Sequence, residues 1–201
     1  MKRRSLILLL LPLLVSIGLA APAPALAWKV VAEATPFVHK TSGYSVQFPV
    51  GWRWSKSPFG PDTIATRDGP ALQVIGVDFR NHRNAFSALK QDSSPDMAPQ
   101  ELAQRLVADA TARNGLTNVE ILSDQPTMLA GRPAFRLHMA YTATVETAGL
   151  RYEEIIVGAN SPQGLFIIRY AAPKLHYFTR GLPEFENALA TFKIDDKQGK
   201  R

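Results

Sequence analysis

The chain contains no cysteine among its 201 residues. This absence excludes disulfide bonds, thiolate nucleophiles and metal sites built on thiolates. It also excludes a bacterial lipoprotein anchor, because no thiol is present to carry the lipid. Stability must therefore come from a packed core alone, and a chain of this length is long enough to bury one.

The familiar signatures of enzymes and metal proteins are missing as well. No serine lies in a Gly-x-Ser-x-Gly elbow, no glycine-rich phosphate loop occurs, and the four histidines form neither an HExxH nor an HxH pair. Glu153 and Glu154 are adjacent on a predicted strand, so they point to opposite faces and cannot share a proton. We therefore predict a protein without catalytic residues, cofactor or metal, unless a metal site assembles in three dimensions.

The charge of the chain narrows the choice of partner. Its 23 basic and 17 acidic residues give a formal net charge of +6, but three of the basic residues lie at positions 2–4. Without those three the net charge is +3, which is modest for a domain that binds nucleic acid. We therefore exclude nucleic acid as the partner.

The N-terminal segment has the three parts of a secretory signal peptide. A basic stretch, Lys2–Arg4, precedes an apolar run over residues 6–20, and Ala25-Leu26-Ala27 is a small-x-small cleavage site. The alternative is a membrane anchor, but the run is short for a span and contains a proline and a glycine. We expect a signal peptide over residues 1–27. The mature chain, residues 28–201, is then a soluble periplasmic or extracellular domain without a membrane span.

The stretch Tyr44–Trp52 organises the rest of the chain. Its tyrosine, valine and phenylalanine alternate with polar residues, as in a strand with one buried face, and Pro49 ends that strand. We predict that the chain returns through Trp52 and Trp54 as the second strand of a hairpin. The two indoles could form a platform for sugars or bases, but a place in the core is favoured because both lie on one side of the strand.

Further strands and two helices follow in separate blocks. Strands are predicted at 63–67, 71–80, 118–128 with a break at Pro126, 134–146, 151–159 and 165–171. One helix is predicted over residues 99–114 and another near the C-terminus, where Pro173 and Pro183 are possible first residues. The charged tail from Lys193 is predicted to be frayed. Because strands pair locally and helices come in blocks, the fold class is α+β, with an antiparallel sheet of about six strands packed between helices.

Three stretches of core and turn residues carry a resemblance to a known family. They are Tyr44 to Trp52, the turn Gly131-Arg132-Pro133-Ala134, and the ending Leu182-Pro183-x-Phe185-x-x-x-Leu189-x-x-Phe192. With them the chain resembles the PsbP/Mog-like superfamily over nearly all of residues 28–201. The resemblance implies one domain with an antiparallel sheet between helical layers. The family includes photosystem II extrinsic subunits, a nuclear-transport cofactor and exported bacterial proteins of unknown role, and the signal peptide is similar to that exported branch.

The family is non-enzymatic and its members mostly bind proteins, so the resemblance implies a binding function. We predict an exported binding protein that engages a protein partner in the periplasm or cell envelope. The alternative is a binder of a small apolar or lipid-like ligand in a groove between sheet and helix. An enzyme is the third class, which the missing catalytic signatures disfavour.

A basic cluster is the predicted contact for the partner. Arg80, His82 and Arg83 follow the end of a predicted strand, and Lys90 comes shortly after them. Loops held by a rigid sheet often carry binding residues, and a basic cluster favours an acidic partner surface. The alternative is a solvated strand end. Phe59, in a loop between proline and glycine, is the other predicted contact residue.

We expect the exported protein to begin at Trp28, because cleavage follows the small-x-small site at Ala27. N-terminal sequencing of protein recovered from the periplasm or the medium measures this directly. Recovery of a chain that retains Met1, or one that starts well inside the domain, would contradict the predicted signal peptide.

Overall fold

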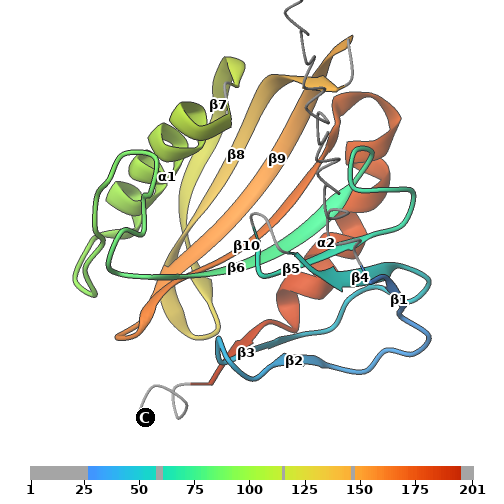
Figure 1. Cartoon of the computed structure of the whole chain (residues 1–201), viewed down its shortest axis with the longest axis horizontal. Coiled ribbons are helices and arrows are strands. Elements are labelled where there is room, and N and C mark those ends of the chain that lie inside the picture. The colour runs from blue at the N-terminus through green and yellow to red at the C-terminus, as the bar shows by residue number, and fades with distance from the viewer. Residues whose placement is uncertain (1–26, 58–60, 115, 146–147, 196–201) are drawn as a thin grey trace, which may run out of the picture.

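The computed structural model describes residues 27–57, 61–114, 116–145 and 148–195 of the chain (Figure 1). Within them, a large antiparallel sheet carries helix α1 (Pro99–Asn114) on one face and helix α2 (Thr179–Ala190) on the other. This arrangement confirms the predicted α+β class, the sheet between helices, and the bounds of the first helix.

The large sheet has eight strands in the described residues, rather than the predicted six or so, and their order is β1-β4-β5-β6-β10-β9-β8-β7. In chain order they span Lys29–Val30 (β1), Arg53–Lys56 (β4), Thr63–Thr66 (β5), Val74–Asn81 (β6), Thr117–Leu129 (β7), Arg132–Val145 (β8), Ala148–Asn160 (β9) and Gly164–Pro173 (β10). At one edge β1 and β4 have only two and four residues. A strand of two residues gives too few alternations for a period-two pattern to reveal it, whereas the strand predicted through Trp52 and Trp54 corresponds to β4.

A second, three-stranded sheet corrects the predicted hairpin. Here β3 (Tyr44–Val46) pairs with β2 (Phe37–His39) and with β11 (Lys193–Ile194), whereas β4 pairs with β1 and β5. The chain therefore leaves one sheet after β3 and enters the other at β4. Gly51, with a φ of 85°, makes this turn, and its N–H donates to the carbonyl of Val31 at 2.9 Å. That hydrogen bond draws the turn toward the first strand instead of back along β3.

The four long strands β7 to β10 form the predicted meander. A two-residue turn at Ala130 and Gly131, with φ of 49° and 77°, joins β7 to β8, as in the tight hairpins whose two turn residues both have positive φ. The predicted break at Pro126 is absent, since β7 runs through it. Because β7 is the edge of the sheet, a residue without an N–H is tolerated there.

The C-terminal region differs from the prediction in two places. Helix α2 begins at Thr179 rather than at either proline, because Pro173 still pairs with Tyr152 in the sheet and Pro183 lies inside the helix. The tail predicted to be frayed pairs with β3 through Lys193 and Ile194. No helix in the described residues is both long and apolar enough to cross a membrane.

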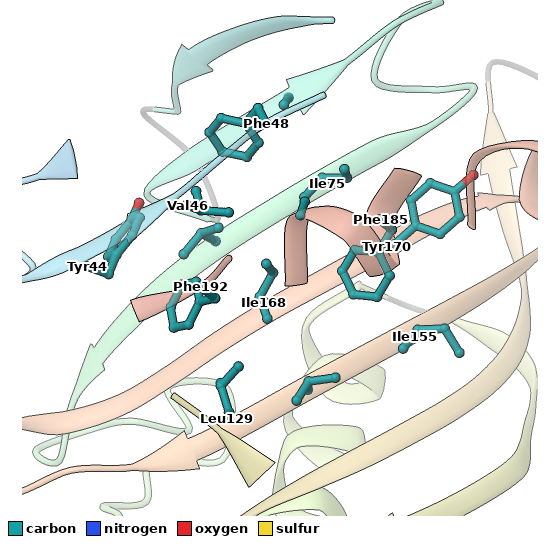
Figure 2. Close-up of a cluster of buried hydrophobic side chains, with 14 of the residues drawn as sticks. Tyr44, Val46, Phe48, Ile75, Leu129, Ile155, Ile168, Tyr170, Phe185 and Phe192 are labelled. Atoms are coloured by element: carbon teal, nitrogen blue, oxygen red, sulfur yellow. The ribbon is translucent and has the colours of Figure 1, made fainter. Parts of the chain in front are cut away.

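Alternation along the central strands divides the interior into two cores. The core on the α2 side holds the aromatic residues of the first strands and of α2, several of which are labelled in Figure 2. There Tyr170 of β10 lies close to Phe185 of α2, with their ring centroids 5.7 Å apart. The core on the α1 side joins Leu102 and Leu106 to Phe135 and Leu137 of β8. Both faces of the sheet are therefore covered, as expected for a sheet packed between helices.

We expect Trp52→Ala to lower the free energy of unfolding by about 3–5 kcal/mol, the range for large aromatic residues removed from cores. The side chain is 0% exposed, and its Nε1–H donates to Glu184 Oε2 at 3.3 Å. Urea denaturation followed by circular dichroism measures the change. Val50→Ala, at a position 53% exposed, is the control and should shift stability by less than about 0.5 kcal/mol. A loss below about 1 kcal/mol for Trp52→Ala would mean that the indole is not part of the core.

Candidate functional site

A cavity of about 440 Å³ lies between helix α1 and the face of the sheet that α1 covers. Its apolar lining comes from Pro61, Leu106, Val107, Ala110, Leu116, Met139, Ile156 and Ile167. Its polar lining comes from Asp78, Arg80, Asp109, Tyr141, Glu154 and Arg169. Five charged side chains around an apolar space are unusual for a core, so this cavity is the candidate site.

The strand alternation explains why these charges gather there. On β6 every second residue, Gly76, Asp78 and Arg80, faces α1, and the register places Arg169 of β10 opposite Gly76. Gly76 has no side chain, which leaves room for its neighbour. A methyl group at that position would lie 3.4 Å from Arg169 Nε and 3.1 Å from Pro61 Cγ. A side chain at this position would therefore crowd Pro61 and come into contact with Arg169.

The first polar group in the cavity consists of Asp78, Arg80 and Asp109, which are linked by hydrogen bonds. Arg80 Nε donates to Asp78 Oδ2 at 2.7 Å, and Arg80 Nη1 donates to Asp109 Oδ2 at 3.2 Å and to the carbonyl of Ala85 at 3.1 Å. The other oxygen of Asp109 accepts the N–H of Ala88 at 2.7 Å. These bonds join β6, α1 and the segment that follows β6, so this group is structural.

The second polar group, Glu154 and Arg169, has fewer contacts. Arg169 Nη1 and Glu154 Oε1 form an ion pair at 3.3 Å, with the Glu154 side chain 6% exposed. Yet Glu154 Oε1 and Arg169 Nε are buried without any hydrogen-bond partner in the described residues. The Glu154 carboxylate raises the pKa of Arg169, which keeps the guanidinium charged. Burial, together with the same carboxylate, raises the pKa of Tyr141 and keeps its phenol protonated.

The structure separates the residues of the predicted partner site. Arg80 lines the cavity and is ion-paired, and its side chain is 18% exposed. His82 is half-buried, with Nδ1 2.8 Å from Ser93 Oγ and Nε2 2.9 Å from the carbonyl of Ser161. Neither side chain is fully exposed, and a role of Arg80 and His82 in binding a partner stays a prediction.

Two of the other predicted contact residues do lie on the surface. Arg83 and Lys90 are exposed, whereas Phe59 lies outside the described residues. A role of these residues in binding a partner stays a prediction.

Sequence reasoning missed Glu154, Arg169 and Asp109 as site residues. Asp109 follows Leu106 by three positions on α1, so it falls within the apolar stripe of the helix, and a charge in such a stripe was the available signal. The adjacent acids Glu153 and Glu154 do point to opposite faces, as predicted. Glu153 lies on the α2 side, 3.0 Å from His138 Nε2 and 3.3 Å from Lys174 Nζ.

Among the residues that the structure describes, no three histidine, aspartate or glutamate side chains converge as metal ligands would. The three carboxylates of the cavity instead face arginines.

Comparison with known proteins identifies the fold. No family model and no curated protein matches the sequence. Among solved structures, cyanobacterial PsbP (CyanoP) from Synechocystis sp. PCC 6803 superposes with a TM-score of 0.54 and 11% sequence identity, over 89% of this chain and 98% of that chain. The fold is PsbP-like. LpqN, involved in cell envelope biogenesis of Mycobacterium tuberculosis, superposes with a TM-score of 0.50 and 16% identity, over 80% of this chain and 90% of its own.

These comparisons confirm the PsbP-like fold that the sequence resemblance implied. At such low identity a shared fold does not transfer a function, because functional sites vary on a common scaffold. Any function must therefore be argued from the cavity itself.

We expect Asp109→Ala to lower the free energy of unfolding by about 3 kcal/mol, the lower end for breaking a buried ion pair. The substitution leaves Arg80 without one carboxylate and the N–H of Ala88 without its acceptor. Chemical denaturation measures the loss. The control on the same helix is Glu101→Ala, which removes an exposed pair with Arg105 and should cost less than about 1 kcal/mol. Equal effects of the two substitutions would show that Asp109 does not hold the structure together.

Proposed function

We propose that this chain is an exported, non-catalytic binding protein that holds a small molecule with an apolar body in the cavity beneath α1. The observation that carries the proposal is the cavity itself. Its volume of about 440 Å³ falls within the usual range of ligand sites, roughly 300–1,000 Å³. Its lining combines eight apolar residues with six polar ones, and ligand sites likewise join apolar surface to placed polar groups.

The chemistry of the lining favours binding over catalysis. Among the described residues that line the cavity there is no serine, threonine, histidine or lysine to act as nucleophile or base. Each carboxylate there is ion-paired with an arginine. Catalytic sites instead tend to place a nucleophile beside a base that activates it.

Export is part of the proposal because of the N-terminal pattern of charge, apolar run and cleavage site. The neighbour LpqN is involved in cell envelope biogenesis, which fits a protein outside the cytoplasm. The protein-partner function predicted from the sequence remains a prediction with less support, since the basic cluster on which it depended is divided.

A pair of phenylalanine substitutions on α1 tests the use of the cavity. Ala110 lines the cavity, whereas Ala108 lies on the exposed side of the same helix. We expect Ala110→Phe to fill the space and weaken binding of Nile red, a neutral apolar dye, by about tenfold or more, which is about 1.4 kcal/mol. Ala108→Phe carries the same change in helix propensity and should leave the affinity within about twofold.

Fluorescence titration of Nile red measures both affinities, and circular dichroism checks that each variant is folded. Native mass spectrometry of the protein from its own host should also show a bound small molecule that Ala110→Phe removes. Equal Nile red binding by the folded Ala110→Phe variant and the unaltered protein would overturn the proposed function.

A further inference from the structure

The polar side chains that line the cavity form two groups. In one group the hydrogen-bonding atoms have partners, and in the other, two atoms do not. Asp78, Arg80 and Asp109 are joined to one another and to the backbone of Ala85 and Ala88 by hydrogen bonds of 2.7–3.2 Å, the normal range for N–H donors to oxygen. Glu154 and Arg169 share only one ion pair, at 3.3 Å. The second group therefore identifies where a ligand would bind.

The unmet groups are one acceptor and one donor. In the described residues, Glu154 Oε1 is a buried oxygen that accepts no well-formed hydrogen bond, although its ion-pair partner Arg169 Nη1 lies 3.3 Å away. Arg169 Nε is a buried N–H without an acceptor there. A buried polar group left unpaired is unfavourable, so a ligand that supplies both missing partners removes two such penalties. A head group that only accepts hydrogen bonds can pair with Arg169 Nε but leaves Glu154 Oε1 unpaired. A head group that only donates leaves Arg169 Nε unpaired instead.

The net charge of the lining restricts the ligand further. The cavity holds three carboxylates and two guanidinium groups, so its lining carries a net negative charge. An anionic head group placed at Arg169 would also lie beside the Glu154 carboxylate, which repels it at short range. A cationic head group placed at Glu154 would lie beside the charged guanidinium of Arg169, which repels it in turn.

Building on the proposed function, we propose that the ligand of this cavity is a neutral amphiphile whose head group both donates and accepts a hydrogen bond, as an amide does. Its N–H donates to Glu154 Oε1 and its carbonyl accepts from Arg169 Nε. Its apolar chain lies against the side chains of α1 and β8 that line the cavity, including Leu106, Ala110 and Met139.

Three probes of equal chain length separate this head group from its charged alternatives. Octanamide is neutral, whereas at pH 7 octanoate is an anion and octylamine is a cation. We expect octanamide to displace Nile red from the protein at a concentration at least about tenfold lower than either charged probe. Displacement by octanoate or octylamine at the same or lower concentration overturns the head-group assignment and leaves the proposed function standing. Failure of every probe, together with unchanged Nile red binding in Ala110→Phe, overturns both.

A double variant locates the preference at Glu154 and Arg169. Glu154→Leu with Arg169→Met replaces the buried pair by apolar side chains, an exchange that proteins often tolerate. We expect this variant to bind Nile red but to lose the preference for octanamide, with the three probes falling within about twofold of one another. Retention of the tenfold preference would overturn the proposal.

The matched control lies on the other face of the same sheet. Arg136 of β8 and Glu186 of α2 form an ion pair there, outside the cavity lining. Glu186→Leu with Arg136→Met makes the same chemical change and should leave the preference for octanamide intact.

A single substitution serves if the cavity double variant does not fold. Glu154→Gln removes only the charge of the acceptor and should reduce the preference for octanamide by about threefold or more. An unchanged preference in folded Glu154→Gln would overturn the proposal.

Discussion

The pairing of β9 with β10 sets the chemistry of both faces of the sheet. Its register places Glu154 opposite Ala171 and Ile156 opposite Arg169, so Glu154 and Arg169 lie diagonally on the α1 side. Because side chains alternate along a strand, a slip of one residue would exchange the two faces. The same register keeps Glu153 on the α2 side, against His138 and Lys174. One set of backbone hydrogen bonds thus separates a structural carboxylate from one in the cavity.

The two faces of the sheet differ in how completely side chains fill the space beneath the helix. The α2 side is filled by aromatic rings, among them the fully buried Tyr170 and Phe185 (Figure 2). Trp52 is fully buried as well. The α1 side has an apolar core beside a space lined by charges. Filling one face supplies stability, and the other can then tolerate a cavity and two unpaired polar atoms. Such local costs are typical of binding sites, which depend on the rest of the structure for their support.

The PsbP-like neighbours show how far a fold can be kept while the sequence changes. Identities of 11% and 16% accompany superposition of most of each chain. What persists at this distance is the overall fold, since many apolar residues can fill a core of the same shape. A shared fold does not determine the charges that line a cavity, so it says nothing about the role of Glu154 and Arg169.

Local patterns in the sequence were enough to predict the helix over residues 99–114, the tight turn at Gly131 and the burial of Trp52, because each depends on neighbours within a few residues. The sequence did not reveal that β3 and β4 belong to different sheets, since alternation marks a strand but does not name its partner. Nor did it reveal that Arg80 pairs with Asp109, 29 positions away, or that Arg169 pairs with Glu154. Only the tertiary structure brings such residues together, because the energy of an ion pair depends on distance in space and not on separation along the chain.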